Sequence, residues 1–190
     1  AVSKTFSLDY ISPLINEGHI HFGENKIQEA ENKWFHFKKN NPNLKLHMVG
    51  KLQSNKAKKA VQLFDYIHSL DNMKLAIKIS KYEIELNKKI KLFIQVNVGK
   101  EDQKSGIDLD NLNNFYSYCT NKLSLNIIGL MCMPPLNSNS NEYFQLLKKT
   151  ATKLNLKELS MGMSDDYEQA ISYGSTFLRL GTVIFGKRDI

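Results

Sequence analysis

Two apolar stretches, Tyr66-Ile-His-Ser-Leu70 and Leu92-Phe-Ile-Gln-Val-Asn-Val98, flank a longer amphipathic stretch at residues 72–88. The short stretches have the length and the β-branched and aromatic content of buried strands. In the long stretch, Met73, Ile77 and Ile84 recur at helical spacing, and lysines occupy the other face. A strand, a helix and a second strand in this order predict a βαβ unit with two parallel strands.

The same alternation continues along the whole chain, with no linker and no internal repeat. It predicts helices near residues 8–17, 25–39, 55–63, 72–88, 108–121, 140–154 and 165–173. The predicted strands are Ala1–Lys4, His19–Phe22, Lys45–Val49, Tyr66–Leu70, Leu92–Val98, Asn126–Met131, Glu158–Met161 and Thr176–Leu180. Eight strands and seven helices favour a single α/β domain over residues 1–190, a (β/α)8 barrel of the TIM type. A doubly wound open sheet is the alternative.

Composition excludes several classes of protein. A chain of 190 residues with 42% hydrophobic residues is too apolar to be disordered, and no apolar run is long enough to span a bilayer. The start of the chain lacks the pattern of a secretory signal, and two cysteines are too few for a disulfide framework. We therefore expect a cytoplasmic protein. The formal net charge of +7 comes mainly from 24 lysines, with only two arginines, Arg179 and Arg188.

The carboxyl ends of the strands are where a parallel barrel collects its chemistry. Lys4 ends the first predicted strand on the same face as Val2, so its amine could point into the mouth of the barrel, where a desolvated lysine can bind an aldehyde. A solvated surface lysine is the plain alternative. Ser160-Met-Gly-Met-Ser-Asp-Asp166 and Gly181-Thr182 follow the last two strands, the usual place for phosphate in such barrels. We expect Ser164 or Asp165 to cap the next helix.

Other site chemistries find little support in the sequence. The five histidines lack the spacing of a metal motif, and no nucleophile motif or nucleotide-binding glycine loop is present. Cys119 and Cys132 are best interpreted as small buried hydrophobic residues. The basic stretch Lys51–Lys59 has no interleaved aromatic residues, so it is typical of a solvated helix start rather than of a nucleic-acid site.

Five motifs occur in the order of a known family: Ala1-Val-Ser-Lys-Thr5, His21-Phe-Gly-Glu-Asn25, Gly50-x-Leu-Gln-x-Asn-Lys56, Ser160-Met-Gly-Met-Ser-Asp-Asp166 and Arg179-x-Gly-Thr182 with Phe185-Gly186. Over nearly its whole length the chain resembles the pyridoxal phosphate homeostasis protein family. The resemblance implies a barrel like the N-terminal domain of alanine racemase. It also implies binding of pyridoxal 5′-phosphate (PLP) and its buffering or delivery, with no assigned reaction.

The resemblance also implies roles for individual residues. Lys4 would form the Schiff base with PLP, and Ser164, Gly181 and Thr182 would hold the phosphate. Arg179 would face the pyridine nitrogen, and Asn25 would lie near the ring, with His47 and Met161 as further neighbours. No residue is expected to be catalytic and none to bind a metal. The expected partners are PLP and apo-forms of PLP enzymes, and the chain is expected to be a monomer that binds neither nucleic acid nor membrane.

One feature departs from the family pattern, and two alternatives remain. Family members usually carry a further N-terminal helix and the first half of the first strand before the position of Ala1. Either the sequence is incomplete at its start or the protein has lost that segment. A PLP-dependent amino-acid racemase would need a second acid or base on the far face of the ring. A basic nucleic-acid-binding protein would bind in a salt-dependent way.

Overall fold

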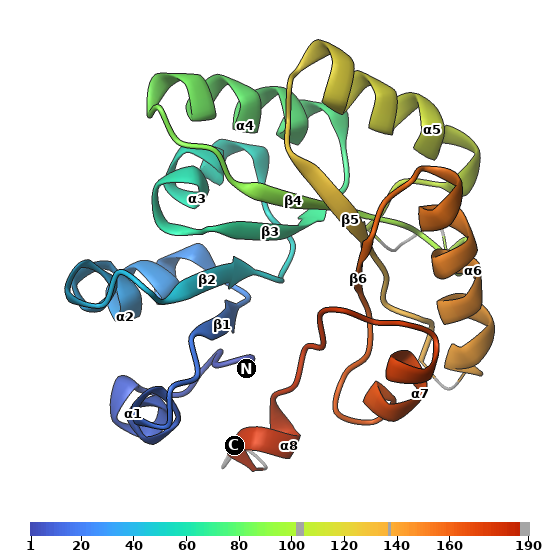
Figure 1. Ribbon diagram of the computed structural model, residues 1–190. Helices are drawn as coiled ribbons and strands as arrows, with labels where there is room; N and C mark the ends of the chain where they lie inside the picture. The colour runs from blue at the N-terminus through green and yellow to red at the C-terminus, as the bar shows by residue number, and fades with distance from the viewer. Residues whose placement is uncertain (102–104, 137, 187–190) are drawn as a thin grey trace.

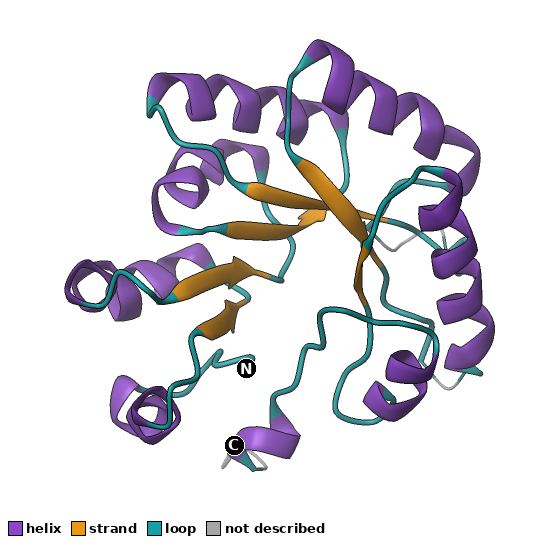
Figure 2. Ribbon diagram, in the orientation of Figure 1, coloured by secondary structure: helices purple, strands orange, loops and turns teal. Residues whose placement is uncertain are grey.

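The computed structural model describes residues 1–101, 105–136 and 138–186. One parallel sheet of six strands forms the centre, and its strand order equals the chain order. The strands are β1 (His21–Glu24), β2 (Lys45–Met48), β3 (Tyr66–Leu70), β4 (Lys91–Gln95), β5 (Ile127–Met131) and β6 (Glu158–Ser160). The sheet curves, and helices cover its outer side (Figures 1 and 2). An order without reversal excludes the doubly wound sheet, in which the strand order turns back at a switch point.

The helices follow the amphipathic stretches closely. They are α1 (Leu8–Asn16), α2 (Ile27–Asn40), α3 (Ala57–Leu63), α4 (Met73–Glu85), α5 (Leu109–Ser117), α6 (Ser140–Lys153), α7 (Tyr167–Ser172) and α8 (Thr182–Phe185). A 3₁₀ turn, η1 (Ser54–Lys56), precedes α3, and a π-helical turn, η2 (Tyr118–Lys122), extends α5. The side chain of Asn72 starts α4 by accepting a hydrogen bond from the backbone N–H of Leu75. The short helix α8 was not predicted from the sequence.

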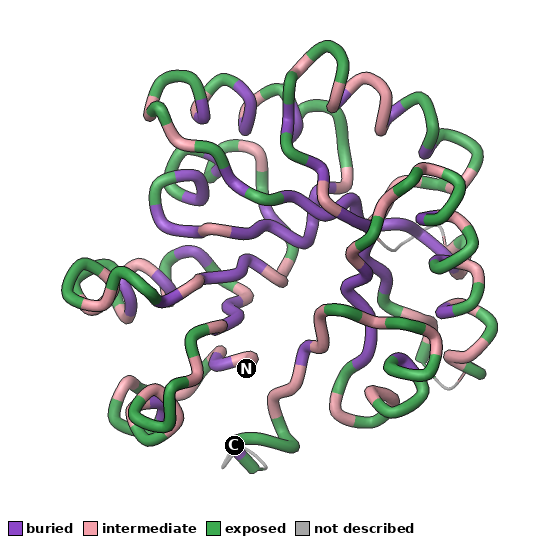
Figure 3. Tube along the Cα trace, in the orientation of Figure 1, coloured by how far each residue is buried: buried purple, intermediate pink, exposed green. Residues whose placement is uncertain are grey.

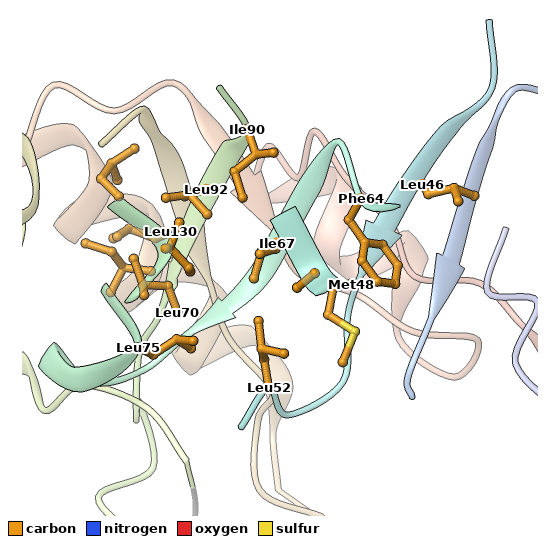
Figure 4. Close-up of a cluster of buried hydrophobic side chains, with 14 of the residues drawn as sticks. Leu46, Met48, Leu52, Phe64, Ile67, Leu70, Leu75, Ile90, Leu92 and Leu130 are labelled. Atoms are coloured by element: carbon orange, nitrogen blue, oxygen red, sulfur yellow. The ribbon is translucent and has the colours of Figure 1, made fainter. Parts of the chain in front are cut away.

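The two faces of the sheet bury different side chains. Alternate strand residues point outward into the main core beneath the helices (Figure 4). The strands are buried along most of their length (Figure 3). This core includes Leu46, Met48, Leu52, Phe64, Ile67, Leu70, Leu75, Ile90, Leu92 and Leu130. The inner face carries a smaller cluster in which Tyr66, Phe93 and Met131 pack against Phe177. All five residues of β3 are buried, as expected of a parallel strand covered on both faces.

Two extended segments lie at the edges of the sheet. Gly23 N–H on β1 donates to Ala1 O at 2.7 Å, and Val2 N–H donates to Leu180 O at 2.7 Å. On the other side, Phe177 N–H donates to a β6 carbonyl at 2.9 Å. The predicted strands Ala1–Lys4 and Thr176–Leu180 therefore keep one isolated bridge each, at Val2 and at Phe177, and are not ladder strands. Lys4 itself lies in the turn that follows the first of them.

Candidate functional site

A cavity of about 430 Å³ lies among the segments that follow the carboxyl ends of the strands. Strand direction alone brings these segments together, because parallel strands all end at the same edge. The cavity is lined by all six predicted cofactor-binding residues, Lys4, Asn25, Ser164, Arg179, Gly181 and Thr182. Its other lining residues are Val2, Val49, Gly50, Lys51, Gln95, Ser105, Met133, Met163 and Asp165.

Lys4 lies in a tight turn at the edge of this cavity. The turn is closed by a hydrogen bond of 3.2 Å from Phe6 N–H to Ser3 O. Thr5 follows Lys4 with φ of 71°, in the left-handed region that β-branched residues rarely adopt. Strained backbone of this kind concentrates at functional sites. The half-buried Lys4 side chain is thus presented by a strained turn.

Glu24 fixes the backbone immediately before Lys4. Its Oε1 accepts hydrogen bonds from Ser3 Oγ at 2.8 Å, from Lys33 Nζ at 2.8 Å and from Trp34 Nε1 at 2.9 Å. Lys33 Nζ also donates to Ser3 O at 2.8 Å, so both polar groups of Ser3 are tied to β1 and α2. Glu24 is fully buried, and a buried carboxylate needs such partners.

Asn25 follows β1 and touches the backbone of the next strand end. A Cβ atom added to Gly50 would lie 2.3 Å from Asn25 O and 2.7 Å from Asn25 Cα, so only glycine fits there. The motif glycine at position 50 therefore serves the close approach of two cavity loops.

Arg179 is the buried charge of the site, with a relative exposure of 7%. Its Nη1 donates to Ser160 Oγ and its Nη2 donates to Cys132 O, both at 2.9 Å. Burial lowers the pKa of Arg179 from its ordinary value, but a guanidinium remains cationic at neutral pH. The only other arginine, Arg188, lies outside the described residues.

The two loops predicted to hold phosphate lie side by side, although one prediction about them is wrong. The expected cap at Ser164 or Asp165 is absent, because α7 begins at Tyr167 and Asp166 precedes it. Asp166 Oδ1 instead accepts from Met163 N–H at 2.7 Å and closes the loop. Ser164 Oγ accepts from Val183 N–H at 3.4 Å, which links this loop to α8.

Gly181 and Thr182 leave backbone donors near the cavity. Within the described part of the chain, no protein group accepts a hydrogen bond from the N–H of Gly181 or of Thr182. A Cβ atom at Gly181 would be no closer than 3.6 Å to Val2 O, an ordinary contact. Packing within the protein therefore does not require glycine at this position, and Gly181 borders the open cavity.

The two further neighbours, His47 and Met161, are buried but are not among the residues that line the cavity. His47 lies on β2 and contacts the inner cluster instead, with its ring stacked on Tyr66 at a centroid distance of 4.1 Å. Neither residue therefore forms the wall of the cavity.

Comparison with known proteins identifies the family. Residues 1–189 match the family described as alanine racemase, N-terminal domain. A pyridoxal phosphate homeostasis protein of Escherichia coli is 35% identical over 100% of this chain and 85% of its own length. One from Synechocystis is 39% identical over 99% of this chain and 90% of its own length. The chain belongs to the pyridoxal phosphate homeostasis protein family.

Solved structures agree with this membership. The structure of PipY from Synechococcus elongatus with PLP bound matches with a TM-score of 0.90 and 37% identity, over 98% of this chain and 91% of PipY. An alanine racemase of Clostridium difficile matches with a TM-score of 0.67 and 14% identity, over 95% of this chain and 48% of the racemase. The second likeness shows the shared fold alone.

The two cysteines of this family member are not reactive. Cys119 and Cys132 are buried, and burial raises the pKa of the Cys132 thiol to about 12, so it stays protonated. Among the described residues, no group of three histidine, cysteine or acidic side chains could hold a metal ion. No helix in the described ranges is long and apolar enough to cross a membrane.

Three residues that line the cavity were not predicted. Lys51, Gln95 and Met133 each lie at or just after the end of a strand, so reading the strand ends could have found them. Their residue types alone did not indicate a binding site, because lysine is abundant in this chain and the other two side chains are uncharged.

Proposed function

We propose that this chain binds PLP in the 430 Å³ cavity and acts in cytoplasmic PLP homeostasis, as a buffer or a donor without substantial turnover. The observation that carries the proposal is the meeting in one cavity of six residues from four segments of the chain. PipY, which was solved with PLP bound, is a 37% identical relative that supports it.

The chemistry of the lining fits this cofactor. PLP carries an aldehyde, a phosphate and a pyridine nitrogen. The cavity offers three cationic side chains, Lys4, Lys51 and Arg179, against one carboxylate, Asp165. The open backbone amides beside Gly181 are suited to an anion, because unpaired N–H groups favour negative charge. A net positive cavity with these donors matches a phosphate-bearing aldehyde.

Each predicted residue then has a distinct task. The Lys4 amine binds the aldehyde covalently, and Asn25 lies beside the ring. Ser164, Thr182 and the N–H of Gly181 hold the phosphate. Arg179 faces the pyridine nitrogen.

The same arrangement supports binding over turnover. PLP supplies a ring that can accept electrons from a bound amine, most strongly when its nitrogen is protonated. Arg179 cannot give up a proton, so it leaves the nitrogen unprotonated. No histidine, tyrosine or cysteine is among the described residues that line the cavity, which disfavours a racemase. These features favour storage of PLP, or its release to apo-enzymes, over turnover.

The architecture proposed with this function is a closed eight-stranded barrel formed by one domain. The hydrogen bonds from Val2 to Leu180 and between Gly23 and Ala1 support it, because they connect the last extended segment to β1. We also propose that the chain acts as a monomer, which light scattering of the PLP-loaded protein would test.

A comparison of two lysines tests the function. Lys4→Ala should abolish the covalent adduct, and Lys51→Ala should retain it, although both residues line the cavity. The measurement is borohydride reduction of the PLP-loaded protein followed by mass spectrometry of its peptides. An adduct on Lys51, or none in the parent protein, would contradict the assignment.

A further inference from the structure

A row of polar side chains crosses the inside of the sheet from the cavity to the opposite end. Arg179 Nη1 donates to Ser160 Oγ at 2.9 Å, and Ser160 Oγ lies 2.7 Å from His68 Nδ1. His68 Nε2 lies 2.9 Å from His47 Nδ1, and His47 Nε2 lies 2.9 Å from His21 Nδ1. His21 is half-buried at the start of β1, so the row ends near the surface.

The cation of Arg179, together with the need of the buried Ser160 hydroxyl proton for an acceptor, gives the hydrogen bonds in this row one direction. A guanidinium only donates, so Ser160 Oγ is an acceptor toward Arg179. The Ser160 hydroxyl proton must then point elsewhere, and among the described residues its one recorded acceptor is His68 Nδ1. His68 therefore carries its proton on Nε2 and donates to His47 Nδ1. By the same logic His47 carries its proton on Nε2 and donates to His21.

The surroundings hold the two inner histidines in place and keep them neutral. The His47 ring stacks on Tyr66, and the His68 ring stacks on Phe93 at a centroid distance of 4.4 Å. Phe177 packs against both histidine rings. Both histidines are buried, and burial lowers the pKa of each well below 6.5.

We infer that Ser160 and His68 are positioning residues for Arg179, and that His47 extends their directed row of hydrogen bonds. Ser160 accepts from the guanidinium because its own proton is committed to His68. The row thereby holds Arg179 against the floor of the cavity and adds no second charge beneath it. The value of this arrangement for PLP rests on the proposed function, whereas the row itself can be tested without PLP.

The first test is nitrogen NMR of the PLP-free protein at neutral pH. His47 and His68 should each show a protonated Nε2 and an unprotonated Nδ1. The side-chain signals of Arg179 should show slow rotation of the guanidinium, and an Arg179→Lys variant assigns them between the two arginines of the chain. A proton on His68 Nδ1 overturns the direction of the row, and a freely rotating Arg179 overturns the positioning role.

The second test compares two buried serines. Ser160→Ala should speed the rotation of Arg179 and weaken PLP and pyridoxal alike by about tenfold, the effect of one hydrogen bond to a charged group. Ser69→Ala is the matched control, because Ser69 is buried next to His68 and its hydroxyl has no partner within the described structure. Equal guanidinium rotation in both variants contradicts the inference, even if the protein binds no PLP. Absence of PLP binding by the parent contradicts only the proposed function.

Discussion

Two glycines line the cavity, and glycine stands at each position for a different physical reason. Gly50 is required by the fold, because an added Cβ would overlap the backbone of Asn25. Gly181 has φ of −117° and room for a Cβ, so the fold does not require it. A residue that the fold does not require but that borders a site is a candidate for ligand contact.

Alanine substitution should separate these two roles. Gly181→Ala should leave the midpoint of thermal unfolding nearly unchanged and weaken PLP more than pyridoxal, because the new methyl group covers the donors proposed for the phosphate. Gly50→Ala should lower the unfolding midpoint. Thermal unfolding and titration with both ligands measure these effects. Equal weakening of the two ligands by Gly181→Ala would show that the phosphate lies elsewhere.

The hydroxyl groups of the same loops give a second prediction at the scale of residues. Ser164→Ala combined with Thr182→Ala should weaken PLP roughly ten- to a hundredfold for each lost charge-assisted hydrogen bond. Pyridoxal, which lacks the phosphate, should lose little affinity. Fluorescence titration of both ligands measures the ratio, and a ratio that stays constant argues against this cradle.

At the scale of elements, the segment that carries Lys4 depends on β1 and α2. Backbone hydrogen bonds to Gly23 and Leu180 hold residues 1–3 at the edge of the sheet. The buried Glu24 and its partner Lys33 anchor Ser3 in addition through side chains. Glu24→Gln leaves the Lys33 cation without its counter-charge in a nearly buried place.

We expect Glu24→Gln to lower the free energy of unfolding by about 3 kcal/mol, as for other broken buried ion pairs. The control is Glu31→Gln, which breaks the more exposed pair with Lys59 and should cost less than about 1 kcal/mol. Urea unfolding measures both variants. Similar small effects would show that Glu24 does not anchor the segment.

Much of the order of helices and strands could be predicted from the sequence, because hydrophobic spacing encodes which face of an element is buried. The amphipathic stretch at 140–154 became α6 (Ser140–Lys153) and the apolar stretch at 66–70 became β3. The extended segments at the two edges of the sheet were predicted as strands, although it was not predicted that each keeps a single bridge. The short helix α8 could not be predicted, because only four residues form it. The row of histidines could not be predicted either. His21 and His47 lie 26 residues apart, His47 and His68 lie 21 residues apart, and they meet only through the register of the strands.

At the scale of the whole molecule, the inside of the sheet differs from a usual parallel barrel. Such interiors are dominated by branched aliphatic residues. Here His47 and His68 lie among Tyr66, Phe93 and Phe177. The free energy of unfolding should therefore depend on the protonation of these two buried histidines.

This coupling predicts a loss of stability in mild acid. His47 and His68 have pKa values held well below 6.5, mainly by burial. His68, His21, the N-terminal amine and Lys38 further lower the pKa of His47, and Arg179 further lowers that of His68. Below pH 6.5 the unfolded chain protonates both histidines and the folded chain does not, so the unfolded state binds more protons. The free energy of unfolding should therefore fall as the pH falls from 6.5 to 5, by roughly 1.4 kcal/mol per pH unit for each histidine.

The variant His47→Gln isolates this effect from the general effect of acid. It should lower stability at pH 7.5, because it disturbs the row, but it should flatten the decline between pH 6.5 and 5 by at most about half, since His19 and His21 also have pKa values lowered mainly by burial. His36→Gln, on the exposed face of α2, should leave both the stability and the slope unchanged. Urea unfolding of the three proteins at several pH values measures the slopes. If the slope of the His47 variant equals that of the parent, the buried histidines are not the source of the acid sensitivity, since a group that binds the same protons in both states cannot change the slope.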